Sequence, residues 1–291
     1  MHIPRKRFGQ NFLVDQEVIN SCLEAIRPQP GDLLVEIGPG LGALTKPLLQ
    51  RLDHLHVVEI DRDIIAWMKS HYPQDKLTIH ACDALKFDFT QLQSGPERGL
   101  IARRQEEGDE TVPQIRRGTD DAVNAASGLA VKRIRVVGNL PYNISTPILF
   151  HLLDNIAGIA DMHFMLQKEV VERMVAEPST PAYGRLSVML QYRLQMEHLF
   201  TVPPGSFDPA PKVESAFVHA IPYATLPSPA EDEQLFSKVV MAAFAQRRKT
   251  LRNTLKGLLD DDGFVQLGIN PQLRAENLSV AEFVAIANYL A

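Results

Sequence analysis

The sequence predicts an α/β fold in which a Rossmann-like, mostly parallel sheet of seven strands is followed by a small helical domain. Three observations support this. Short β-branched or apolar runs alternate with helical patterns through the first two thirds of the 291 residues, which is typical of a parallel sheet with crossover helices. A glycine-rich turn follows the first of these runs. The last quarter has helical periodicity only.

The expected strands follow the order of a doubly wound sheet. Five apolar runs form its parallel part, at residues 33–37, 55–60, 77–80, 134–138 and 162–166. A helical stretch over 183–192 then precedes two further strand-like runs, at 197–202 and 215–221, with a loop rich in proline and glycine between them. We expect these two runs to form a hairpin that adds an antiparallel edge.

Two changes of composition suggest the domain organisation. Residues 223–229 are proline-rich and lack helical periodicity, so we expect a catalytic domain over 1–224 and a small helical domain over 225–291. Residues 94–130 contain five glycines, twelve charged residues and no aromatic residue. Such a segment buries little apolar surface, and we expect a flexible insertion before the fourth strand.

Composition also excludes several classes of protein. The chain is 45% hydrophobic and 22% charged, and no apolar run approaches the ~20 residues that span a bilayer. The first residues lack the apolar stretch of a secretory signal. Cys22 and Cys82 are far apart, and His54 and His56 lack a third ligand nearby, so neither a disulfide nor a metal site is expected. We expect a cytoplasmic protein with no membrane partner and no metal.

A glycine-rich turn over residues 36–45, Glu-Ile-Gly-Pro-Gly-Leu-Gly-Ala-Leu-Thr, joins an expected strand to a helix. Glycines there let the backbone turn tightly and approach a nucleoside. The turn alone fits NAD as well as S-adenosylmethionine. Glu59 ends the second strand and is suited to bind ribose hydroxyls. Asp83 follows the third strand and is suited to bind a cofactor's adenine amine, or to cap a helix or turn.

The motif Gly-Asn-Leu-Pro-Tyr-Asn-Ile-Ser, residues 138–145, follows the fourth strand. In an open α/β sheet this edge faces the ligand crevice. The oxygen of the Asn139 carboxamide and a backbone carbonyl near Leu140 are suited to accept the two hydrogens of an exocyclic amine, which frees its conjugated electron pair for attack on a methyl group. Tyr142, after Pro141, is suited to stack on the base. The alternative is an Asn-Pro turn with a core tyrosine.

Nucleic-acid binding would have to depend on local clusters, because the net charge is −5. Phosphate contact by two clusters, one at each end of the chain, is our preferred interpretation. The second lies on an expected helix, where the alternative is a solvated charged face. The first cluster is Arg5, Lys6 and Arg7, and the second is Arg247, Arg248, Lys249 and Arg252. Further basic residues lie at 132–135 and, within the insertion, at 103, 104, 116 and 117.

Motifs along nearly the whole chain resemble the bacterial small-subunit ribosomal RNA adenine dimethyltransferases, the family whose loss confers kasugamycin resistance. They are Arg-Phe-Gly-Gln-Asn-Phe-Leu at 7–13, the stretches 36–45, 139–145 and 203–215, Gln-Lys-Glu-Val at 167–170 and Gln-Arg-Arg-Lys-Thr at 246–250. The resemblance implies a class I S-adenosylmethionine methyltransferase fold. It also implies methyl transfer to the exocyclic amines of two adjacent adenosines in a hairpin loop near the 3′ end of 16S rRNA.

The resemblance assigns roles to individual residues as well. Phe207 would be a second stacking face opposite Tyr142, although from the residues alone it is equally well a loop anchor packed on the core. The expected partner is rRNA within the immature small ribosomal subunit, bound by a monomer. Contacts to S-adenosylmethionine would come from Asn11, Leu13, Gly38, Glu59, Asp83 and Asn139.

Three alternatives stay open at this point. The first is an assembly factor whose main act is to bind an immature subunit. The second is an NAD-dependent oxidoreductase, which the glycine-rich turn allows but which leaves residues 139–142 unexplained. The third is the related large-subunit rRNA adenine methyltransferase that confers macrolide resistance. The motifs of that enzyme overlap heavily, so the preference for the small subunit depends on the whole-chain resemblance.

Overall fold

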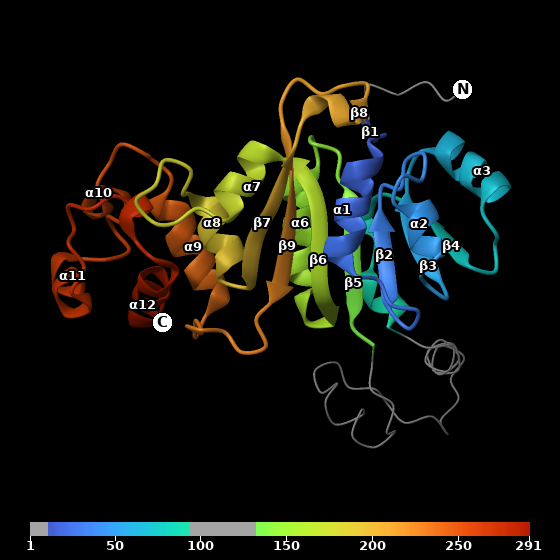
Figure 1. The fold of residues 1–291 in the computed structure, drawn as a ribbon. Helices are drawn as coiled ribbons and strands as arrows, with labels where there is room; N and C mark the ends of the chain where they lie inside the picture. The colour runs from blue at the N-terminus through green and yellow to red at the C-terminus, as the bar shows by residue number, and fades with distance from the viewer. Residues whose placement is uncertain (1–10, 94–131) are drawn as a thin grey trace, which may run out of the picture.

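A seven-stranded sheet dominates the computed structural model, which describes residues 11–93 and 132–291 (Figure 1). Its order is β4-β3-β2-β5-β6-β9-β7. The first five strands in this order pair in parallel, and β9 is antiparallel to both β6 and β7. The predicted class I methyltransferase fold with an antiparallel edge is confirmed. The strands are β2 (Leu33–Ile37), β3 (Leu55–Glu59), β4 (Leu77–Ala81), β5 (Ile134–Asn139), β6 (Ile159–Gln167), β7 (Leu194–Val202) and β9 (Ser215–Pro222).

Helices cover both faces of the sheet, because the central strands are apolar on both sides. In β5, Val136 belongs to one core and its neighbour Val137 to the other. The first core packs against α6 (Ser145–Asp154), α7 (Lys168–Met174) and α8 (Arg185–Gln191). The second packs against α1 (Gln16–Ile26), α2 (Thr45–Leu49) and α3 (Arg62–His71). Short 3-10 turns complete this region, namely η2 (Ala84–Lys86), η3 (Phe89–Leu92), η4 (Ile156–Gly158) and η5 (Pro204–Ser206).

The C-terminal helices gather beyond β7, at the opposite end of the sheet from α3 (Figure 1). They share a third core with α8, because Tyr183, Val188 and Tyr192 belong to the same cluster as Phe236 and Phe283. The predicted boundary after residue 224 stays a prediction. None of the helices in the described ranges has the length and apolar content to cross a bilayer. The elements are α9 (Glu233–Ala243), α10 (Leu251–Thr254), α11 (Asp261–Leu267), η6 (Ala275–Asn277) and α12 (Val280–Leu290).

The expected helix through the second basic cluster is wrong for residues 247–249 and confirmed only for Arg252, which lies in α10. Helix α9 ends at Ala243, residues 247–249 lie in a turn, and α10 begins at Leu251 after Thr250 as its N-cap. The Leu251 side chain is fully buried and its N–H donates to the carbonyl of Leu273. The chain has to turn to bring this residue into the third core, which a continuous helix would prevent.

A charged network crosses the sheet at the amino end of β5. The Arg135 guanidinium bonds both Asp161 on β6 and Asp32, and it donates to the carbonyl of Ile26 at the end of α1. Although burial opposes the effect, the nearby His219 imidazole and the bonds from Arg135 lower the pKa of Asp161 to about 2. Arg135 is therefore engaged inside the protein. The basic residues at 132–135 do not form a free patch, since Lys132 also donates to the carbonyl of Gly31.

Asp161, His163 and His219 also stand close together, with one possible ligand atom of each within 4.8 Å of the others. Arg135, however, bonds both oxygens of Asp161, and the two imidazole rings stack with centroids 4.1 Å apart. Burial lowers the pKa of His163 to about 4, so its ring is neutral. The cluster therefore has the contacts of a structural network.

We expect Arg135→Met to destabilise the protein by about 3 kcal/mol, because it strands two partly buried carboxylates without their cation. Arg133→Met is the matched control, since Arg133 lies two residues earlier, just before β5, and is exposed. Its expected effect is within about 0.5 kcal/mol. Urea unfolding of both variants measures the difference. Equal stability of the two would contradict a supporting role for the network.

Candidate active site

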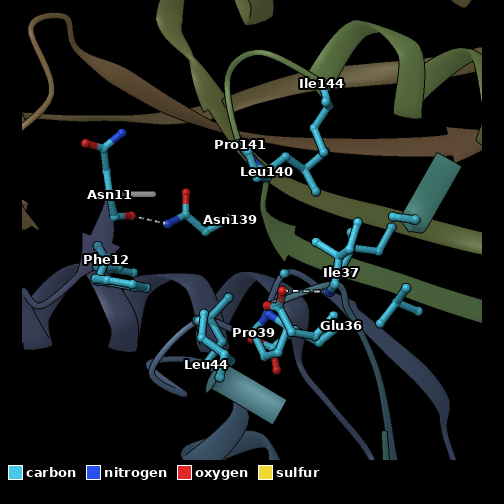
Figure 2. Close-up of a pocket in the computed structure, with 18 of the residues that line it drawn as sticks. Asn11, Phe12, Glu36, Ile37, Pro39, Leu44, Asn139, Leu140, Pro141 and Ile144 are labelled. Carbon is cyan, nitrogen blue, oxygen red and sulfur yellow. Dashed lines mark hydrogen bonds between the residues drawn. The ribbon is translucent and has the colours of Figure 1, made fainter. Parts of the chain in front are cut away.

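A cavity of about 490 Å³ opens where the parallel strands end, a size that suits a small-molecule ligand. Its wall combines the start of the described chain, the glycine-rich turn, the ends of β3 and β4, and the turn after β5 (Figure 2). All six residues expected to contact S-adenosylmethionine line it. So do the candidate catalytic residues Leu140, Pro141 and Tyr142. Residues far apart in the sequence are thereby brought to one place.

The glycine-rich turn and β5 approach each other closely at this cavity. Gly38 has φ +66°, a conformation that favours glycine, and its N–H donates to the carbonyl of Val58 at 3.0 Å. At Gly138 of β5, a Cβ atom would lie only 2.5 Å from the carbonyl oxygen of Ile37. Glycine at these two positions lets the ends of β2 and β5 lie side by side, so both motifs open into one cavity.

Two acidic residues of the cavity bind backbone groups. Glu59 accepts the N–H groups of Ile60 and Asp61 at 2.8 Å each through Oε1, and burial raises its pKa. Asp83 accepts the N–H of Leu85 at 3.0 Å and caps η2. The capping role considered for Asp83 is thus present, together with its place in the cavity wall.

Glu36, at the end of β2, is a site residue that the sequence interpretation missed. It lines the cavity, is 2% exposed and accepts a bond of 2.6 Å from the Thr45 hydroxyl. Burial, with a smaller contribution from Glu59, raises its pKa to about 7. The available signal was a single carboxyl in an otherwise apolar strand. The exposed apolar rim of Val14, Leu41 and Ile60 gave no signal, because isolated apolar residues are ordinary in any chain.

The Asn-Leu-Pro-Tyr turn is held at both ends. Asn139 donates from Nδ2 to the carbonyl of Asn11 at 3.0 Å, as the dashed line in Figure 2 shows. Tyr142 is half-buried, and its hydroxyl shares a hydrogen bond of 2.7 Å with that of Ser215 on β9. Between them, Leu140 is 1% exposed, and its N–H donates to the backbone carbonyl of Met165. The turn is fixed while the tyrosine ring still borders the cavity.

Phe207 is placed differently. It lies in β8 (Phe207–Asp208), which pairs with β1 (Phe12–Leu13), and its ring is 3% exposed within the second core. It is absent from the cavity wall, so this structure does not bring it opposite Tyr142. Its burial matches the anchor alternative, and its stacking role stays a prediction.

The basic residues of the second cluster lie outside the cavity. Arg247, Arg248 and Lys249 are exposed in the turn between α9 and α10. Arg252 forms an exposed ion pair with Asp261 at 2.6 Å, and such pairs contribute little, about 0 to 1 kcal/mol. The first basic cluster and the 94–130 insertion lie outside the described residues.

The sheet order, the glycine-rich turn and the Asn-Leu-Pro-Tyr motif at one cavity define a class I methyltransferase. Over its full length, residues 1–291, the chain matches the family described as ribosomal RNA adenine dimethylase. It belongs to that family, and the resemblance inferred from the sequence is confirmed.

Relatives and solved structures agree with this assignment. The ribosomal RNA small subunit methyltransferase A of Methylobacillus flagellatus is 66% identical over 290 residues, covering 100% of this chain and 99% of the relative. The protein of the same name from Thiobacillus denitrificans is 56% identical over 291 residues, with the same coverage. A dimethyladenosine transferase from Plasmodium falciparum superposes with a TM-score of 0.67 at 21% identity, covering 94% and 95% of the two chains. The 23S rRNA methyltransferase ErmE superposes with a TM-score of 0.64 at 19% identity, covering 96% of this chain and 99% of the other. At such identities the two structures show the fold alone.

The raised pKa of Glu36 predicts a pH-dependent stability. The carboxyl favours its protonated form in the folded state, so its stabilising effect is complete below pH 4.5 and is lost as pH rises through about 7. Glu36→Gln stays neutral and can still accept the Thr45 bond. We therefore expect the melting temperature of this variant, relative to wild type, to rise by about 3 °C or more between pH 5 and pH 8. Calorimetry measures both melting temperatures. If the difference between Glu36→Gln and wild type does not change from pH 5 to pH 8, Glu36 is ionised over that whole range and the prediction fails.

Proposed function

We propose that this protein transfers methyl groups from S-adenosylmethionine to the exocyclic amines of two adjacent adenosines near the 3′ end of small-subunit rRNA. The product is dimethyladenosine. One observation carries the proposal, namely that Asn139 and Tyr142 border the same cavity as the glycine-rich turn, Glu59 and Asp83. The preference for the small subunit is supported by relatives of that name, which match over their whole length.

The cavity has the groups that this cofactor requires. Glu59 is placed for the ribose hydroxyls and Asp83 for the adenine amine. Gly38 and Gly40, both at positive φ, border the cavity with their backbone and offer a surface for the methionine portion. The apolar rim of Val14, Leu41 and Ile60 offers a surface for the adenine ring. When bound, the cofactor supplies an electrophilic methyl group.

The chain's own residues would orient the target amine. Oδ1 of Asn139 accepts one of its hydrogens, and a carbonyl near Leu140 accepts the other, so that the nitrogen becomes pyramidal and nucleophilic. Tyr142, with its hydroxyl held by Ser215, presents its ring to the base; such stacking contributes ~1 to 3 kcal/mol. No metal and no dedicated base are needed, because the methylated amine is acidic enough to lose its proton to water.

RNA docking would use surfaces outside the cavity. The exposed turn at 247–249 and Arg252 support phosphate contact by a small C-terminal domain over 225–291, with Arg5, Lys6 and Arg7 as a second group. The partner proposed is the immature small ribosomal subunit in the cytoplasm, bound by a monomer. A role in subunit assembly is compatible with catalysis. The oxidoreductase alternative is wrong for a member of this family.

The decisive experiment offers the purified protein, with tritiated S-adenosylmethionine, small subunits lacking the modification and, in a parallel reaction, large subunits. Nucleoside mapping then locates the label. We expect label in dimethyladenosine of the small-subunit rRNA and none in large subunits. Asn139→Ala should lose ~10²- to 10³-fold in kcat while still binding the cofactor. Asn155→Ala, at the far end of α6, is the control and should remain active. Label confined to large subunits would refute the proposal, and a fully active Asn139→Ala would refute the role of Asn139.

Leucine substitutions separate stacking from packing. Tyr142→Leu should lower kcat/KM for RNA by about 5- to 150-fold, which corresponds to ~1 to 3 kcal/mol of stacking, whereas Tyr142→Phe keeps the ring and most of the activity. For Phe207→Leu, burial predicts a loss of about 1 kcal/mol of stability with activity retained. If Phe207→Leu instead loses activity like Tyr142→Leu at unchanged stability, the ring stacks on substrate and the anchor interpretation is wrong.

A further inference from the structure

The two ends of the Asn139 carboxamide differ chemically, because Oδ1 only accepts and Nδ2 only donates hydrogen bonds. The proposed function, on which this inference rests, requires the oxygen to face the target amine. A rotation of 180° about the last side-chain bond would turn the Nδ2 hydrogens of Asn139 toward the hydrogens of the target amine. No hydrogen bond could then form, and the reaction would stop. Size and shape do not distinguish the two orientations, so a hydrogen-bond partner has to select one of them.

The carbonyl of Asn11 is that partner. It lies 3.0 Å from Nδ2, and a carbonyl oxygen can bond only the donor end of the amide. Both residues border the cavity, and Figure 2 shows the bond crossing from the chain before β1 to the end of β5. With Nδ2 engaged on this side, Oδ1 is directed to another part of the site.

The position of the Asn11 carbonyl depends in turn on a second segment. Strand β1 pairs with β8, with Leu13 opposite Phe207. The carbonyl of Ser206 accepts the N–H groups of Val14 and Asp15 at 2.9 and 3.3 Å. The Ser206 hydroxyl donates to Asp15 at 2.7 Å. Ser206, Phe207 and Leu13 are at most 5% exposed, so these three members of the clamp are buried.

We propose that the pairing of β1 with β8 sets the orientation of the catalytic amide: Ser206 holds β1, and β1 presents the Asn11 carbonyl that orients Asn139. Ser206 is thus a positioning residue, and Phe207 contributes by anchoring the same clamp in the core. This gives the 203–208 segment a role in the reaction that does not require it to touch the base.

The first test is Asn139→Asp, which keeps two acceptor oxygens of similar shape but has no hydrogen to offer Asn11. If orientation by Asn11 matters, its kcat should fall ~100-fold or more, close to that of Asn139→Ala. If an acceptor oxygen alone is sufficient, Asn139→Asp retains more than a tenth of the wild-type kcat, and the proposal is overturned.

The second test compares Ser206→Ala with Ser187→Ala. Ser187 is buried to a similar degree, and its replacement also removes hydrogen bonds, but it lies in α8 and its hydroxyl donates to the carbonyl of Arg173 in α7. Both variants should lose stability. At a temperature where both are folded, only Ser206→Ala should lower kcat, by at least about fivefold. It should also shift the side-chain NH₂ signal of Asn139 in ¹⁵N NMR, which is assigned by its loss in Asn139→Asp. Equal kcat values and an unmoved signal would overturn the proposal.

The NMR measurement keeps this inference distinct from the proposed function. If wild-type protein methylates no rRNA, the proposed function fails on its own. An Asn139 NH₂ signal that Ser206→Ala shifts and Ser187→Ala leaves unchanged would still support orientation by β1. If wild-type protein is active but Ser206→Ala leaves the Asn139 NH₂ signal unchanged, the proposed orientation by β1 is contradicted and the proposed function is not.

Discussion

The close approach of β2 and β5 at Gly138 is the constraint on which the site depends. A side chain there would meet the carbonyl of Ile37, and any separation would move the glycine-rich turn away from Asn139. Parallel pairing of β2 with β5 then places the glycine-rich turn, proposed to hold a nucleoside, beside the Asn-Leu-Pro-Tyr turn, proposed to hold an amine. The chemistry of the family follows from this adjacency, because methyl transfer needs donor and acceptor within contact distance.

Much of the sheet was predictable because its central strands are buried on both faces. The runs at 33–37, 55–60 and 134–138 match the central strands β2, β3 and β5 to within a residue, since mostly apolar stretches mark such strands clearly. The ends of other strands were predicted less accurately. Strand β6 starts at Ile159, three residues before the expected position, because Asp161 is a polar strand residue that Arg135 satisfies. Pairing partners of this kind are invisible in a single sequence.

The same limit applies to the site. Gly38, Glu59, Asp83 and Asn139 were predictable from the pattern, since each lies at or just after the end of a strand. Asn11 and Leu13 came only from the family resemblance, and the structure gathers all six in one cavity. The bond between Asn11 and Asn139 was not predictable, because it joins residues separated by 128 positions. Phe207 shows the same limit. In the sequence, an aromatic residue beside prolines fits either substrate contact or packing in the core. The structure shows that its ring is buried, in a segment that pairs with β1. Local pattern identifies chemistry, whereas orientation depends on tertiary structure.

A crystal structure of the protein with S-adenosylhomocysteine, the demethylated cofactor, tests the account most directly. We predict the ribose hydroxyls on Glu59, the adenine near Asp83, the sulfur beside Asn139, and Nδ2 of that residue still on the carbonyl of Asn11. A cofactor bound away from the ends of β2 and β5, or an Asn139 amide rotated so that its nitrogen faces the sulfur, would contradict the central claim.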